Sequence, residues 1–241
     1  MKSQILVIDD EENVRYTFDS FLSQEGYQVQ TVSSLQDGKA MLATQNFDLI
    51  FLDILLGSEN GLDILREVKE RSLKCLVVMV TGAPDVETAA EAVRYGAFDY
   101  LPKPVQQYKL LHIARAALKH KRLLEEKETF RIRLEGLFRC ALEGIIITDP
   151  DLCVAEMNAA AKRLFHCGDA VVGKSLEEIS ESTASGYLKK FSDIVKARFE
   201  GEIYRAEQED GRFLSFTAAP LITEEGDDYG YILVIREEPS A

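Results

Sequence analysis

The first 120 residues alternate short, continuous apolar runs with amphipathic stretches of helical spacing, about five times at intervals of about 20–25 residues. Apolar strands that alternate with amphipathic helices predict a parallel sheet covered by helices on both faces. We therefore expect an α/β domain with a doubly wound, five-stranded parallel sheet over residues 1–120. In such sheets the ligand site lies at the carboxyl ends of the strands. The expected strands are residues 5–8, 27–32, 47–52, 76–80 and 98–101.

Polar side chains follow four of these strands: Asp9 and Asp10 the first, Asp53 the third, Thr81 the fourth and Lys103 the fifth. Because the carboxyl ends of parallel strands meet at one edge of a sheet, we expect the five side chains to converge on one crevice. Three carboxylates at close range repel one another, and a hard divalent cation such as Mg²⁺ relieves that repulsion. With an ammonium and a hydroxyl beside it, a carboxylate is equipped to attack phosphorus and become an acyl phosphate.

Four motifs in this region, ILVIDDEE, IFLDILL, MVTG and FDYLPKP, resemble the receiver domain of two-component response regulators, which has a flavodoxin-like fold. The resemblance implies that Asp53 is the phosphoacceptor. It also implies that Mg²⁺ is bound by Asp9, Asp10, Asp53 and the main-chain carbonyl of Leu55. The phosphoryl donor implied by the family is a histidine kinase or a phosphotransfer protein.

The same resemblance assigns roles to three further residues. Lys103 pairs with the phosphoryl group, and the Lys103–Pro104 peptide is often cis in relatives. Thr81 and Tyr100 form a switch, in which Thr81 moves to a phosphoryl oxygen and the ring of Tyr100 turns inward. One departure is Gly57-Ser58, where relatives commonly have Pro-Gly, and it bears on the rigidity of this loop.

Residues 106–139 are rich in helix formers and contain neither glycine nor proline before Gly136. A seven-residue spacing selects eight positions, six of them apolar, a pattern typical of a coiled-coil seam. We therefore expect a long linker helix that forms a homodimer; the alternative is a single amphipathic helix lying on its own domain. The eight positions are Ile113, Ala116, His120, Leu123, Lys127, Phe130, Leu134 and Leu137.

From Gly144 the sequence becomes β-rich, with two strands, small helices and a three-strand meander that includes a hairpin turn at Asp210-Gly211. This order predicts an α+β domain with an antiparallel sheet. The segments ALEGIIITDPDLCVAEMNAAAKRLF, VVGKSLEEI and YGYILVIRE resemble the PAS sensor domain, which we assign to residues 129–238. The resemblance implies a module that dimerises, or that binds haem, flavin or a small metabolite.

Candidate cofactor ligands are few in this second domain. The expected helix at 187–198 has no histidine, His166 is interpreted as a surface residue, and the Asn-Cys-Arg sequence of a photoactive flavin site is absent. Six apolar residues are candidates to line a pocket, and the same residues suffice for a filled core, so we expect no tightly bound cofactor. They are Ile145, Ile147, Phe191, Ile194, Phe216 and Ile232.

Charge and composition argue against several other classes of protein. With 41 acidic and 28 basic residues, the net charge of −13 disfavours direct binding to nucleic acid or to an anionic membrane. The four cysteines form no CxxC pair and histidines number three, so we expect free thiols rather than a cysteine–histidine metal site. Apolar runs fall far short of the ~20 residues of a membrane span and the N-terminus is unlike a signal peptide, so we expect a cytoplasmic protein.

The leading hypothesis is a two-component response regulator, in which phosphorylation of Asp53 changes conformation or dimerisation and the linker helix relays the change to the PAS module and a downstream output. This is signalling chemistry rather than an enzyme activity. One alternative is the N-terminal part of a longer receiver–PAS transcription regulator or kinase whose effector domain lies outside this chain. Another is a phosphohydrolase with an aspartate nucleophile; such enzymes use an Asp-x-Asp turn, whereas Asp9 and Asp10 are adjacent.

Overall fold

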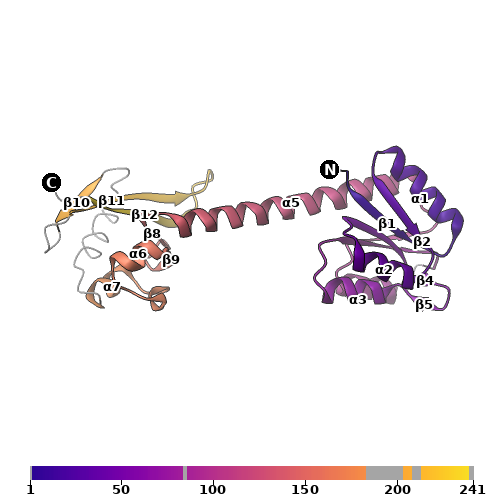
Figure 1. Cartoon of the computed structure of the whole chain (residues 1–241), viewed down its shortest axis with the longest axis horizontal. Helices are drawn as coiled ribbons and strands as arrows, with labels where there is room; N and C mark the ends of the chain where they lie inside the picture. Colours follow the sequence, from indigo (N-terminus) through magenta and orange to yellow (C-terminus); the bar gives the residue numbers. More distant parts are fainter. Residues whose placement is uncertain (1, 84–85, 183–202, 208–212, 239–241) are drawn as a thin grey trace. The chain divides into compact units, whose positions relative to one another are not determined.

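The structure is a computed structural model that describes residues 2–83, 86–182, 203–207 and 213–238. The chain divides into two compact units, Met1–Thr129 and Phe130–Ala241, and each is described by itself (Figure 1). Among the described residues, no helix combines the length and the apolar character needed to cross a lipid bilayer.

The first unit contains a five-stranded sheet in the order β2-β1-β3-β6-β7. Every neighbouring pair is parallel, and all five residues of β3 are buried, as expected for a strand covered on both faces. The predicted five-stranded parallel sheet is confirmed. Its strands are β1 (Gln4–Ile8), β2 (Gln28–Val32), β3 (Leu49–Asp53), β6 (Leu76–Thr81) and β7 (Asp99–Pro102).

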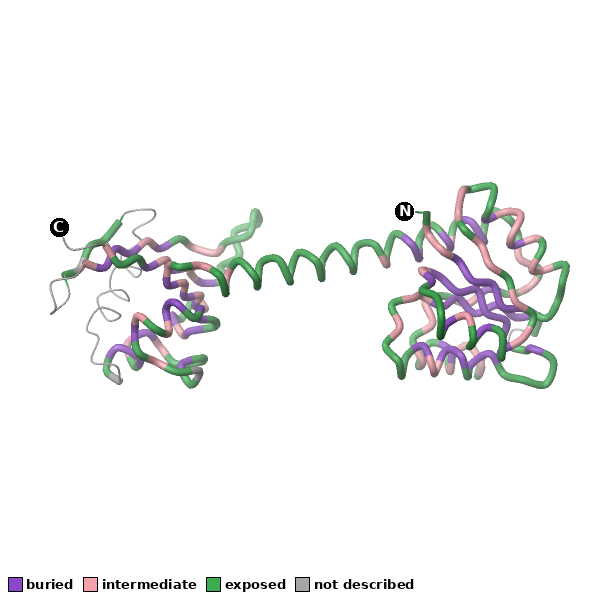
Figure 2. Tube along the Cα trace, in the orientation of Figure 1, coloured by how far each residue is buried: buried purple, intermediate pink, exposed green. Residues whose placement is uncertain are grey.

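Alternate residues of each strand face two different hydrophobic cores. Ile5 and Val7 of β1 pack with α1 and α5 on one face, while Leu6 and Ile8 pack with α2, α3 and α4 on the other. Figure 2 shows the central strands of this sheet as long buried stretches. Helices on both faces give the arrangement expected of a flavodoxin-like fold. The helices are α1 (Glu12–Gln24), α2 (Leu35–Thr44), α3 (Leu62–Glu70), α4 (Val86–Arg94) and α5 (Gln107–Cys140).

A short hairpin, which was not predicted from the sequence, follows β3. β4 (Leu55–Leu56) pairs with β5 (Glu59–Asn60), and Gly57 in the turn has φ +60°, a conformation that favours glycine. Gly61 then caps the start of α3. A side chain at position 61 would collide with the main-chain carbonyl of Asp53, so glycine allows α3 to begin directly against the end of β3.

The helix α5 is continuous over 34 residues. Its first part contributes Leu110, Ala114 and Leu118 to the core of the first unit. Ile113, the first position of the predicted seam, also packs against that core, so this part of the helix lies on its own domain. Further along, large apolar side chains are exposed, and four of them are positions of the predicted seam. These four are Leu123, Phe130, Leu134 and Leu137.

Among the described residues, the second unit contains a five-stranded antiparallel sheet in the order β10-β11-β12-β8-β9. The antiparallel sheet expected of the α+β domain is therefore present. His166 follows α6 and is exposed. The strands are β8 (Gly144–Thr148), β9 (Val154–Met157), β10 (Tyr204–Glu207), β11 (Phe213–Ile222) and β12 (Asp228–Glu238), and the helices are α6 (Ala159–Leu164), α7 (Leu176–Ser182) and a 3-10 turn at Asp169–Val171.

The core of the second unit includes Ile146 of β8 and Phe216 of β11. The proposed pocket lining is wrong for Ile145, Ile147 and Ile232, which are half-buried and lie outside this core cluster. Successive residues of a strand face opposite sides of the sheet, so Ile146 points into the core and its two neighbours do not. The remaining predictions for this region lie outside the described residues: Phe191, Ile194, the helix at 187–198 and the turn at Asp210-Gly211.

Asn158 joins several segments of this unit through four hydrogen bonds. Its Oδ1 accepts from the amide of Ala161 (2.8 Å), as the N-cap of α6, and from the amide of Ile145 (2.9 Å). Its Nδ2 donates to the carbonyls of Phe138 near the end of α5 (3.1 Å) and of Glu143 (2.9 Å). The residue is 1% exposed, so the hydrogen bonds of this amide are made where water has little access.

Candidate functional site

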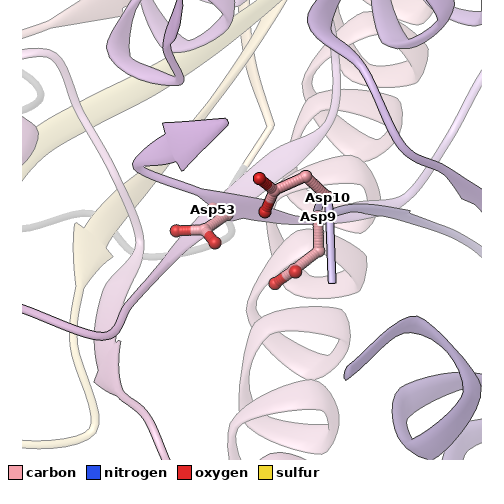
Figure 3. A group of neighbouring side chains, drawn as sticks. All are labelled: Asp9, Asp10 and Asp53. Carbon is pink, nitrogen blue, oxygen red and sulfur yellow. The ribbon is translucent and has the colours of Figure 1, made fainter. Parts of the chain in front are cut away.

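The carboxyl ends of β1 and β3 bring Asp9, Asp10 and Asp53 together (Figure 3). Because β1 and β3 are parallel neighbours with Ile8 opposite Leu52, the residue that follows each of these positions lies at the same edge of the sheet. One carboxylate oxygen of each aspartate lies within 4.8 Å of the others. Asp9 and Asp53 are 1% and 4% exposed, whereas Asp10 faces solvent.

Lys103, which follows β7, places its ammonium among these carboxylates. Its Nζ lies 2.6 Å from Asp53 Oδ2, 2.8 Å from Asp9 Oδ2 and 2.7 Å from Glu11 Oε1. Its main-chain amide donates to the carbonyl of Thr81 (2.6 Å), and the Lys103–Pro104 peptide is cis. Burial alone would lower the pKa of Lys103, but its hydrogen bonds to Asp53, Asp9 and Glu11 outweigh that effect and hold the pKa above its ordinary value.

The carboxylate of Asp9 is destabilised by its surroundings. Burial raises the pKa of Asp9 above its ordinary value, although Lys103 and the amide of Glu11 act in the opposite direction. Asp9 Oδ1 accepts from the Glu11 amide at 2.9 Å. Asp9 Oδ2 is buried and has the charge of Lys103 nearby, but among the described residues it accepts no hydrogen bond of regular geometry.

This donor set fits a divalent cation of the magnesium type. Three carboxylates converge, and Mg²⁺ prefers oxygen ligands from one or a few carboxylates together with waters and phosphate oxygens. The buried, incompletely satisfied oxygen of Asp9 is an atom that a cation at this edge would complete. Asp9, Asp10 and Asp53 are therefore the residues that would hold the ion.

The hairpin after β3 closes over the same cluster through main-chain amides. The amide of Leu55 donates to Asp53 Oδ1 (3.1 Å), and the amide of Gly57 donates to Asp10 Oδ2 (3.1 Å). These contacts place the loop beside the carboxylates. The predicted ligand role of the Leu55 carbonyl stays a prediction.

Thr81 and Tyr100 lie near the same edge of the sheet. Thr81 ends β6, is 1% exposed, and accepts the amide of Ala83 on its Oγ1 (3.2 Å). Tyr100 pairs with Met79 and packs against the core on the α2–α3–α4 face. Its hydroxyl is buried without a hydrogen-bond partner among the described residues. The ring of Tyr100 is thus turned into the protein, and its role as a switch stays a prediction.

Sequence reasoning missed Glu11, which supplies a third carboxylate to Lys103. The signal was present in the run Asp9-Asp10-Glu11-Glu12, but only the first two acids were assigned to the strand end. Glu11 sits one position before α1, where a side chain is able to reach back over the edge of the sheet.

A buried carboxylate held against an ammonium, with two further carboxylates beside it, is suited to phosphoryl chemistry. The family model of the response regulator receiver domain matches residues 5–115 of this chain. Residues 5–115 are a response regulator receiver domain. The receiver domain ends within α5, so the remainder of that helix and the second unit lie beyond the matched region.

Two bacterial regulatory proteins are similar to this receiver domain and to residues that follow it in the chain. The alginate biosynthesis transcriptional regulatory protein AlgB of Pseudomonas aeruginosa is 39% identical over 137 residues, which cover 56% of this chain and 30% of AlgB. The nitrogen assimilation regulatory protein NtrX of Azorhizobium caulinodans is 29% identical over 220 residues, which cover 88% of this chain and 48% of NtrX. The chain thus spans less than half of the length of either relative.

Among solved structures, NtrX from Brucella abortus in complex with ADP superposes with a TM-score of 0.52 at 35% identity, over 56% of this chain and 30% of that one. The similarity to NtrX of A. caulinodans is longer than the first unit, so it includes part of the second unit.

Proposed function

We propose that Asp53 accepts a phosphoryl group in a Mg²⁺-dependent reaction, from a histidine kinase or a phosphotransfer protein, and that the chain relays this event within a two-component system. The observation that carries the proposal is the placement of Asp53. The residue is 4% exposed, and its carboxylate lies 2.6 Å from the ammonium of Lys103 and shares a cluster with Asp9 and Asp10.

In this reaction a carboxylate oxygen of Asp53 forms a bond to phosphorus while the bond between phosphorus and the leaving group of the donor breaks, and the electron pair of that bond departs with the leaving group. When bound, Mg²⁺ supplies charge neutralisation between the donor phosphate and the aspartates. Lys103 stays close to the oxygens that carry the developing charge. The backbone amide of Leu55 holds Asp53 in position through Oδ1.

Phosphorylation is proposed to act through Thr81 and Tyr100. A phosphoryl group adds nearly two negative charges and three acceptor oxygens, and the Thr81 hydroxyl is a donor near that edge. Moving a two-state population from 1:99 to 99:1 takes about 5.5 kcal/mol. The bonds that Thr81 and Lys103 make to the phosphoryl group must therefore be stronger in one state than in the other. The face formed by α4, β7 and the first part of α5 lies nearest to these residues, and we expect it to change partners.

For the second unit we propose a PAS sensor module at residues 129–238, joined to the receiver at 1–120 by a linker helix at 106–139. The proposal is supported by the antiparallel sheet and its apolar core. The exposed apolar positions of α5 support a homodimer formed through the linker helix or the PAS module. We expect neither a tightly bound cofactor in the PAS module nor binding of the chain to a membrane.

A second candidate is that the chain is the receiver and sensor part of a longer transcription regulator. Its support is the naming of AlgB and NtrX as regulatory proteins of which this chain matches less than half. Direct binding of DNA by residues 1–241 is not expected, because their net charge is −13.

The test compares the wild type with Asp53→Asn after incubation with acetyl phosphate and Mg²⁺. Intact mass should show one added phosphoryl group in the wild type and none in the variant, and the mass in solution should change only when Asp53 is phosphorylated. A wild type that gains no phosphoryl group from acetyl phosphate or from a kinase would refute the proposal. Equal labelling of wild type and variant would move the phosphoacceptor to another residue.

A further inference from the structure

Three carboxylates share the ammonium of Lys103. The oxygens of Asp53, Glu11 and Asp9 lie 2.6, 2.7 and 2.8 Å from its Nζ. The contacts with Glu11 and Asp53 are hydrogen bonds, and Asp9 Oδ2 occupies the third position around the ammonium as an ion pair, so the three oxygens fill the space around Nζ. A phosphoryl oxygen that binds Lys103 must therefore take the place of one of the three carboxylates.

Glu11 differs from the other two partners in its exposure. The side chains of Asp9 and Asp53 are 1% and 5% exposed, and that of Glu11 is 60% exposed. A released Glu11 carboxylate therefore returns to water, whereas the buried Asp9 side chain has no exposed position to move to and Asp53 itself would carry the phosphoryl group. Glu11 is the partner whose loss costs least.

The backbone of Glu11 is held in place while its side chain is left free to swing. Its amide donates to Asp9 Oδ1 (2.9 Å), and its carbonyl accepts from the amides of Val14 and Arg15 (3.1 Å each) in the first turn of α1. Rotation about side-chain bonds alone is enough to withdraw the carboxylate from Lys103. No rearrangement of α1 is required.

We propose that Glu11 is a displaceable counter-ion of Lys103, which opposes the phosphorylated state and thereby sets how readily the receiver domain is switched on. This inference rests on the proposed phosphorylation of Asp53. Before phosphorylation, Glu11 occupies one N–H of Lys103. When the phosphoryl group arrives, Lys103 turns to one of its oxygens and Glu11 moves into solvent. Glu11 acts through Lys103 and is a positioning residue.

The test uses the full chain at saturating Mg²⁺ and beryllofluoride, a phosphoryl mimic, with binding measured by titration calorimetry. Glu11→Gln removes the competing charge, and Glu12→Gln is the matched control. Glu12 is the next residue, is exposed, and forms no ion pair among the described residues. We expect Glu11→Gln to lower the Kd about fivefold, near the upper range for the loss of an exposed ion pair, and Glu12→Gln to change it less than about twofold.

A second variant, Glu11→Ala, removes the acceptor atoms altogether and should show a gain similar to that of Glu11→Gln. A purely structural role for Glu11 predicts weaker binding of beryllofluoride in both variants. A gain in affinity therefore distinguishes the counter-ion role from a structural one. Equal Kd values for Glu11→Gln and Glu12→Gln, or weaker binding by Glu11→Gln, would overturn the inference. A wild type that binds no beryllofluoride and is not labelled by acetyl phosphate would instead overturn the proposed function.

Discussion

Replacing Asn158 by alanine should lower the free energy of unfolding of the second unit by more than an average substitution does. The change removes the N-cap of α6, which is worth about 0.5–2 kcal/mol. It also leaves the amide of Ile145 and the carbonyls of Phe138 and Glu143 without their side-chain partner, and each such hydrogen bond is worth about 1 kcal/mol. We expect a loss of about 4 kcal/mol in the free energy of unfolding, above the usual range of about 0.5–3 kcal/mol.

A matched variant separates the capping contribution from the rest. Serine is about as good an N-cap as asparagine, but its hydroxyl is too short and has too few donors to replace the two bonds made by Nδ2. Asn158→Ser should therefore recover about 1 kcal/mol relative to Asn158→Ala and leave the larger part of the loss. That remaining part measures the connection between the end of α5 and the strand β8.

The assay must resolve the two units, and the sequence contains no tryptophan to report on either. Hydrogen exchange at increasing urea, read by mass spectrometry on peptides from β8 and α6, gives the free energy of opening for the second unit. Peptides from β1 and β3 are the internal control and should exchange as in the wild type. A loss below about 1 kcal/mol, or a serine variant as stable as the wild type, would refute the reasoning.

Asp9, two glycines and two cysteines carry the remaining predictions. Burial raises the pKa of Asp9 above its ordinary value of 3.8, so folding favours the protonated side chain. The stability that Asp9 contributes is therefore fully present below pH 3.8 and is lost as the pH rises through the raised pKa of the folded state. Asp9→Asn should therefore have a higher Tm than the wild type at neutral pH in EDTA, with the difference shrinking in acid; a lower Tm at neutral pH would contradict this. Gly61→Ala should cost about 1–3 kcal/mol in urea unfolding because its methyl group collides with the carbonyl of Asp53, whereas Gly136→Ala, in open space on α5, should gain about 1 kcal/mol. Burial raises the pKa of the Cys75 thiol to about 11, while Cys140 is exposed, so a thiol reagent near neutral pH should modify Cys140 well before Cys75 in peptide mapping.

Much of the first unit was predictable because its central strands, β1, β3 and β6, are buried on both faces and therefore appear in the sequence as continuous apolar runs. The position of the aspartates after those runs followed from the geometry of parallel sheets, and the structure brings Asp9, Asp10, Asp53 and Lys103 together. The third partner, Glu11, was not predictable in the same way. Its contact with Lys103 depends on the direction in which an exposed side chain turns, and strand periodicity carries no information about that direction.

The second unit shows where periodicity fails. The run from Ile145 to Ile147 is apolar at every position, so the sequence gives no alternation from which to choose the residue that faces the core. The structure places Ile146 there. The hairpin β4–β5 was missed for a different reason: its strands have two residues each, too few for any periodic pattern. The role of Asn158 was not predicted from the sequence, because its bonds to Phe138 and Glu143 join residues 20 and 15 positions apart and no local pattern indicates them.

The contact between Gly61 and the carbonyl of Asp53 limits where this domain is free to diversify. Position 61 admits no side chain, so the end of the loop lies against the main chain at the end of β3. The residues of the hairpin before it, Gly57–Asn60, are exposed. Ser58 and Glu59 therefore tolerate changes of charge, whereas Gly57 is constrained by its φ of +60° and by its hydrogen bond to Asp10. Such changes would alter the charge beside Asp53 without moving its carboxylate.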